Sequence, residues 1–187
     1  MHAPQRPQSM RLVTLEKALS LAIFALCLFQ LYQSTKVGVT PRGTPARAAL
    51  THLHLSVGLT VLPLVLLRLW LWRRLPRPAR PQRVPASADA LARHCNFAFY
   101  LTVLGFCLTG PLFAWADGHV VGWFDVFTLP APFAPSYRLS VTLGYLHSTL
   151  GFWVLYLAGF TLLVGLWQAL RYRIAPWRLL PATGWGS

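Results

Sequence analysis

Acidic residues are nearly absent from this chain of 187 residues. Only four are present against 17 lysines and arginines, which gives a formal net charge of +13. Charge of either sign is missing altogether from four long, mostly apolar stretches: residues 18–35, 48–67, 94–116 and 139–170. Each stretch reaches the roughly 18 to 20 residues that a helix needs to span a membrane.

A polar stripe is also missing from these stretches, although a soluble helix of that length would carry one. The sequence therefore predicts an all-α integral membrane protein, a four-transmembrane-helix bundle that forms a single domain over residues 1–187. The predicted spans are about 12–33, 48–72, 90–115 and 139–170, and the tails outside them are 1–11 and 174–187. Little of the chain remains for a soluble domain.

The basic residues are unevenly distributed between the predicted loops. Thirteen of the 17 lie before the first span, between the second and third spans, or in and after the end of the fourth. The other four flank the two remaining loops: Lys36, Arg42, Arg47 and Arg138. The positive-inside rule thus predicts an N-in, C-in protein with both tails in the cytoplasm. The charge indicates topology and contact with anionic lipid headgroups, and we expect no nucleic-acid partner.

Cysteine is scarce, and the three present (Cys27, Cys95 and Cys107) predict no disulfide framework. The Cys-x-x-Cys-His motif is missing, which excludes ordinary covalent attachment of a c-type haem. The first span follows a basic leader, as a signal peptide would. Residues 30–36 offer no clear small-residue cleavage site, so we expect this span to be retained.

Histidine occurs near the beginning of two spans that run inward. Glycine follows His54 and His147 by four residues, at Gly58 and Gly151, and Gly144 precedes His147 by three. These spacings put each imidazole on one helix face with a bare backbone groove, at similar depth near the outer side. Imidazole is a good axial ligand for haem iron, so the pattern favours a bis-histidine haem between the second and fourth helices. The alternative is a pair of interfacial histidines that bond to water or to a neighbouring helix.

Charged side chains beside the spans suggest less specific roles. Arg68 lies fourteen residues after His54, about 21 Å down the helix, where we expect it to snorkel to the inner interface. Glu16 suits the beginning of the first helix because the helix macrodipole favours an acid there. On the outer side, Arg47 and Arg138 pair with haem propionates or attract a small anion, or else form a solvated surface.

Proline and aromatic residues predict local irregularities. Pro63 predicts a kink in the second span, and Gly110-Pro111 predicts a weakened outer end of the third. Residues 117–138 are rich in aromatic residues and proline, and we expect this segment to lie on the membrane surface.

A series of motifs then occurs in a characteristic order. They are His54-Leu-Ser-Val-Gly58, Arg68 and Arg73-Arg74, Tyr100 and Gly110, the segment 118–130 ending in Thr128-Leu129-Pro130, and His147. In these motifs the chain resembles the bacterial cytochrome b561 family over about residues 11–173. These are four-helix haem proteins of the inner membrane that include superoxide:quinone oxidoreductases.

The chain also departs from the family that it resembles. That family usually binds two b haems stacked across the membrane, and His54 and His147 match the ligands of the outer one. The inner ligands are missing, because the first span has no histidine and Thr161 stands at the second helix-4 position. Asn96 replaces a histidine common in the third helix, and Gly165 resembles a remnant of the inner seat. The resemblance therefore implies one haem b, at the outer side.

The resemblance implies a one-electron carrier of a respiratory chain in a bacterial inner membrane. It would exchange electrons with quinone or with a periplasmic redox protein at the outer face. Two alternatives remain open. One is a superoxide oxidase coupled to ubiquinone reduction, with outer arginines attracting the anion. The other is a non-catalytic accessory subunit of a larger membrane redox complex.

Overall fold

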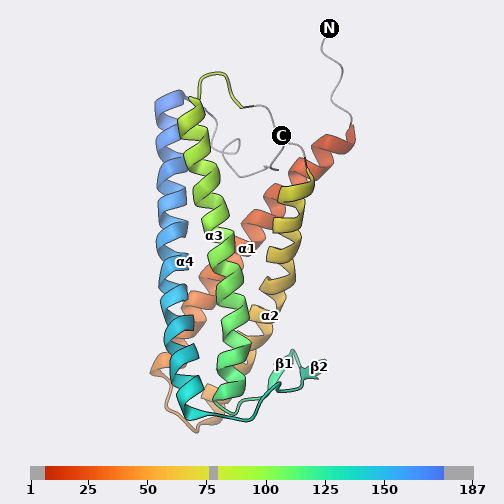
Figure 1. The fold of residues 1–187 in the computed structure, drawn as a ribbon, viewed down its shortest axis with the longest axis vertical. Helices are drawn as coiled ribbons and strands as arrows, with labels where there is room; N and C mark the ends of the chain where they lie inside the picture. The colour runs from red at the N-terminus through yellow and green to blue at the C-terminus, as the bar shows by residue number, and fades with distance from the viewer. Residues whose placement is uncertain (1–6, 76–79, 175–187) are drawn as a thin grey trace.

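The computed structural model describes residues 7–75 and 80–174, with side chains from Thr14 onward. Four long helices and one short hairpin make up this part of the chain (Figure 1). In order they are α1 (Pro7–Val39), α2 (Pro45–Arg74), α3 (Ala86–Ala116), β1 (Val121–Trp123), β2 (Phe127–Leu129) and α4 (Tyr137–Tyr172). The predicted all-α bundle of four helices is confirmed.

Each of the four helices is long and apolar enough to cross a membrane. In the best-buried of these spans only 44% of the residues are buried inside the protein, so most of each apolar surface faces outward. Lipid is a solvent that matches such a surface, and a helix satisfies its own backbone hydrogen bonds there. By length and composition, the chain is a multi-pass membrane protein.

The helices extend beyond the uncharged stretches because capping groups, and not hydrophobicity, set their ends. α1 continues through a polar last turn to Val39. α2 begins after Thr44, whose hydroxyl accepts a hydrogen bond from the backbone N–H of Arg47. Ser136 caps α4 in the same way by accepting from the N–H of Leu139. Side-chain acceptors of this kind satisfy the free N–H groups of a first turn.

The two prolines that were predicted to disturb the spans both lie inside helices. Pro63 is part of α2 and Pro111 is part of α3. The predicted weakening at Gly110-Pro111 does not interrupt α3, which continues to Ala116. Neighbouring helices tolerate a missing backbone donor in a membrane bundle.

The bundle consists of two helical hairpins. α1 packs on α2 and α3 packs on α4, and the contact between α2 and α3 joins the two pairs, whereas α1 and α4 touch only slightly. Figure 1 shows α3 and α4 side by side and α1 crossing the bundle obliquely. We call the end with β1 and β2 the hairpin end, and the end where α2 leads into α3 the opposite end.

The centre of the bundle is filled by one β-branched side chain from each helix. Ile23, Val65, Val103 and Val154 are each at most 1% exposed. These side chains have few rotamers and therefore pack closely at little entropic cost. Such van der Waals packing is what holds helices together in lipid, where the hydrophobic effect between them is weak.

The segment between α3 and α4 contains a β-hairpin that is docked on the bundle, and its expected place on the membrane surface stays a prediction. Val121 is fully buried against Leu55 and Ala114. The hydroxyl of Ser56 on α2 accepts a 2.9 Å hydrogen bond from the backbone N–H of Phe124. The hairpin is therefore attached to α2 by both apolar and polar contacts.

A buried ion pair links α1 and α2 in the half of the bundle nearer the opposite end. Arg68 is 0% exposed; its Nη1 lies 3.2 Å from Oε1 of Glu16, and its Nε donates to the hydroxyl of Ser20. The guanidinium also lies over the rings of Trp72 and Tyr100. The prediction that Arg68 snorkels is wrong, because a facing carboxylate pairs with it inside the protein. The helix-start role of Glu16 is wrong too, since α1 begins more than two turns earlier.

Candidate functional site

The two histidines singled out by the sequence lie next to each other inside the bundle. The ring centroids of His54 on α2 and His147 on α4 are 6.4 Å apart, and the ring planes are nearly perpendicular, at 83°. α2 and α4 run in the same direction from the hairpin end, so both side chains enter the bundle at the same depth. Their proximity agrees with the depth expected from the topology.

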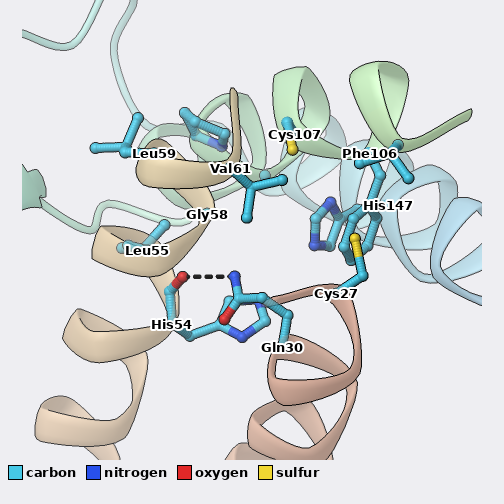
Figure 2. Close-up of a pocket in the computed structure, with 13 residues that line it drawn as sticks. Cys27, Gln30, His54, Leu55, Gly58, Leu59, Val61, Phe106, Cys107 and His147 are labelled. Carbon is cyan, nitrogen blue, oxygen red and sulfur yellow. Dashed lines mark hydrogen bonds between the residues drawn. The ribbon is translucent and has the colours of Figure 1, made fainter. Parts of the chain in front are cut away.

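All four helices line the pocket that contains the two imidazoles (Figure 2). Its walls are Cys27, Gln30, His54, Leu55, Gly58, Leu59, Val61, Val103, Phe106, Cys107, Gly110, Pro111 and His147. The space not filled by protein atoms is ≈430 Å³, including the open mouth of the pocket. No charged side chain is among these lining residues, so the two imidazoles lie in a mostly apolar pocket.

His147 is held by three residues of α3. Phe106 stacks on its imidazole, with ring centroids 4.2 Å apart and an interplanar angle of 10°. A Cβ atom at Gly110 would lie 3.1 Å from Cε1 of His147, so only glycine permits this approach without a shift. The hydroxyl oxygen of Thr109 lies 3.1 Å from Nδ1 of His147. The imidazole is thus fixed on two sides and at one nitrogen.

His54 is held through its backbone instead. The side-chain Nε2 of Gln30 on α1 donates a 2.8 Å hydrogen bond to the backbone oxygen of His54 (Figure 2). Two buried polar atoms at this place have no hydrogen-bond partner, namely Nδ1 of His54 and Oε1 of Gln30. Unsatisfied buried groups are costly and uncommon, so they often mark a functional site.

The glycines predicted to leave an open groove have side chains beside them. A Cβ at Gly144 would lie 2.9 Å from the ring of Phe113, and one at Gly151 would lie 3.2 Å from the ring of Phe106. A Cβ at Gly58 would lie 3.2 Å from Nε2 of Gln30. The space beside these three glycines therefore accommodates phenyl rings and an amide in this structure.

The two arginines predicted near the site lie outside the pocket. Arg47 donates two 2.7 Å hydrogen bonds, to the backbone oxygens of Val37 and Thr40, and so closes the end of α1. Arg138 is exposed in the first turn of α4. Neither is among the residues that line the pocket. Their proposed contact with propionates stays a prediction.

The site contains a pair of nitrogen ligands and too few protein groups to hold a bare metal ion. Within residues 7–75 and 80–174, no group of three or more histidine, cysteine, aspartate or glutamate side chains could hold a metal. Two imidazoles suit a metal that brings its other ligands with it, as the iron of haem does. With each nitrogen about 2 Å from a shared metal, the two ring centres would be about 6 Å apart, which agrees with the 6.4 Å observed. The spacing of the two imidazoles fits haem ligation.

Several pocket residues were not recognised in the sequence as part of a site. They are Cys27, Gln30, Phe106 and Cys107 in the pocket wall and Thr109 next to it, and Gly110 was noted for other reasons. Gln30 carried a usable signal, because a polar side chain in a membrane span is usually functional. Thr109 carried none, since a threonine in such a helix often bonds only to its own backbone.

Comparison with known proteins adds no relative to this description. No family model matches the chain, and no curated protein is similar to it. Fold and site together define a four-helix membrane protein with a partly buried pair of histidines between its second and fourth helices.

Proposed function

We propose that the chain is a membrane b-type cytochrome of the cytochrome b561 type, which carries single electrons through one haem b held by His54 and His147. The observation that carries this proposal is the 6.4 Å spacing of the two imidazoles in a pocket lined from all four helices. The motifs shared with the cytochrome b561 family support it.

The residues of the pocket would have separate roles in an electron carrier. Haem supplies an iron that changes its charge by one unit at low structural cost. His54 and His147 would hold the group, and rigidly positioned ligands would keep the structural change on electron transfer small. The apolar wall excludes water from the iron, while Phe106 and Gly110 keep His147 in position.

The site lies toward the hairpin end of the bundle, and the charge distribution favours the periplasmic side for that end. The basic residues cluster toward the opposite end, which the positive-inside rule assigns to the cytoplasm of a bacterial inner membrane. The opposite half holds the pair of Arg68 and Glu16 and lacks histidines between helices. Electron exchange would therefore take place at the hairpin end, with quinone in the bilayer or with a periplasmic donor.

The test is the haem content of the purified, detergent-solubilised protein. We expect a haem-to-polypeptide ratio near one by pyridine haemochrome, with low-spin b-type bands, and loss of that haem in His54→Ala and His147→Ala. His52→Ala is the matched control, because His52 lies on the same helix as His54 but contacts Asp125 of the hairpin and not the pocket. A ratio near zero, or a normal low-spin spectrum in either ligand variant, would contradict the proposal.

An enzymatic form of the same proposal is superoxide oxidation with ubiquinone as electron acceptor. It is favoured by two exposed cations at the hairpin end, Arg42 and Arg138, which would attract an anionic radical. Neutral glutamine at both positions would then slow superoxide consumption, and more so at low salt. A rate of superoxide consumption that is the same without these charges would contradict this enzymatic form and favour the simple electron carrier.

A further inference from the structure

We infer that Thr109 and Gln30 are positioning residues that set the protonated nitrogen of the two pocket histidines. Each would hold Nδ1 of its histidine as the N–H and leave Nε2 with a free lone pair. The assignment of the proton to Nδ1 is independent of the proposed function. Only the next step, in which Nε2 binds iron, rests on the proposed haem. The inference is carried by four hydrogen-bond contacts and two unpartnered atoms.

The hydrogen bonds of Thr109 determine which way the bond to His147 runs. Its hydroxyl oxygen lies 2.9 Å from the backbone oxygen of Gly105 and 3.1 Å from that of Phe106. A backbone oxygen can only accept, and we assign the single hydroxyl proton of Thr109 to its own helix, as is usual for a threonine inside a helix. The contact of 3.1 Å with Nδ1 of His147 must then be donated by the histidine. His147 is therefore protonated at Nδ1.

Gln30 provides the equivalent acceptor for His54. The atom of its amide that faces the backbone oxygen of His54 has to be the NH₂ group, because an oxygen there would have no proton to share. This identifies the remaining amide atom, Oε1, as an acceptor that is buried without a partner. Nδ1 of His54 is buried without a partner in the same pocket. A bond from Nδ1–H to Oε1, which the structure does not contain, would satisfy both atoms.

Gly58 makes this arrangement possible. A Cβ atom there would lie 3.2 Å from Nε2 of Gln30, which is tighter than an ordinary contact. The glycine four residues after His54 thus admits the amide that anchors to His54, which gives a structural reason for the spacing seen in the sequence.

Both acceptors are uncharged, and this has a consequence for the ligands. A histidine that binds metal usually donates its other N–H to a second group, and loss of that group typically lowers metal affinity by about 10- to 100-fold. Thr109 and Gln30 would supply this orientation without placing a carboxylate, with its negative charge, next to the imidazoles.

The experiment compares isosteric variants with matched controls. Thr109→Val and Gln30→Leu remove the acceptors. Thr102→Val removes a similar hydroxyl of α3 that bonds to Ala98, and Gln168→Leu removes a similar bond between helices, to Ala88 at the opposite end. Histidine ¹⁵N chemical shifts of the haem-free protein in detergent report the tautomers, with signals assigned by their loss in the His54→Ala and His147→Ala variants. Binding of hemin reports the affinity.

We expect a single Nδ1–H tautomer for both histidines in the unchanged protein, and a mixture at His147 in Thr109→Val and at His54 in Gln30→Leu. Hemin affinity should fall about 10- to 100-fold in both variants, and Thr109→Ser should restore it. Tautomers and affinities that match those of the two controls would overturn the inference. Tautomers that change as expected in a protein that never binds hemin would support the positioning role and refute the proposed function.

Discussion

At the scale of single residues, Gly110 determines how closely α3 approaches the imidazole of His147. One turn earlier on the same helix, Phe106 stacks on the same ring at 4.2 Å. The imidazole is therefore held between a bare backbone and an aromatic face. A methyl group at 110 would have to displace Cε1, which it would meet at 3.1 Å.

Gly110→Ala should therefore weaken haem binding although it removes no ligand. We expect a loss of about tenfold, the lower end of the range for disturbed ligand orientation, measured by hemin titration. The matched control is Gly105→Ala, whose Cβ would meet only Cδ1 of Leu150 at an ordinary 3.6 Å. Equal affinity in the two variants would show that the close approach of α3 has no role in the site.

At the scale of elements, α2 presents two different faces near the hairpin end. His52, Ser56 and Thr60, spaced by one helical turn, bind the β-hairpin. Nε2 of His52 lies 3.3 Å from a carboxylate oxygen of Asp125, and Thr60 accepts a 3.0 Å bond from the indole N–H of Trp123. His54 and Gly58, two positions further along, line the pocket. The hairpin thus covers the outside of the helix that carries one of the candidate ligands.

Ser56→Ala should loosen the hairpin and leave the helices intact. The substitution leaves the N–H of Phe124 without its acceptor, at a cost of about 0.5–1.5 kcal/mol, the usual net contribution of one hydrogen bond. Faster hydrogen exchange confined to residues 121–129 would be the expected signature. Ser34→Ala is the control, because Ser34 is exposed and bonds only to its own helix. Exchange as slow as in the unchanged protein would mean that apolar contacts alone hold the hairpin.

At the scale of the whole molecule, the two halves of the bundle differ in chemistry. The half at the hairpin end contains the pair of imidazoles in a mostly apolar pocket. The other half contains the ion pair of Arg68 and Glu16, both almost fully buried. In that half the Thr161 hydroxyl is buried without a partner, and nothing lies within 4 Å of a Cβ placed at Gly165. This asymmetry is consistent with the proposal of a single haem.

Arg68→Met should destabilise the bundle without removing the haem site. Breaking a buried ion pair from one side leaves an uncompensated charge and costs about 3–5 kcal/mol. The double variant Arg68→Met with Glu16→Gln should recover most of the loss, which thermal unfolding in detergent would measure. Arg42→Met, in an exposed loop, should change stability by less than about 0.5 kcal/mol. A single variant as stable as the double one would show that the two charges are not coupled.

Hydropathy and charge distribution predicted the four helices, their order and the relative depth of His54 and His147. These features depend on local composition and on the fact that successive helices cross a membrane in opposite directions, so they can be read from the sequence alone. Helix ends were less accurate, because caps such as Thr44 set them and hydropathy does not register a cap. The hairpin was missed because its strands are three residues long and its pairing is visible only with α2 in place.

By itself, the sequence determined that this protein spans a membrane four times and brings two histidines to one depth. Only the tertiary structure decided which side chains meet across helices: Arg68 with Glu16, Thr109 with His147 and Gln30 with the backbone of His54. The reason is physical. Membrane insertion depends on the hydrophobicity of each segment taken separately, whereas a contact between helices depends on their rotation and crossing angle, which are set by the packing of all four at once.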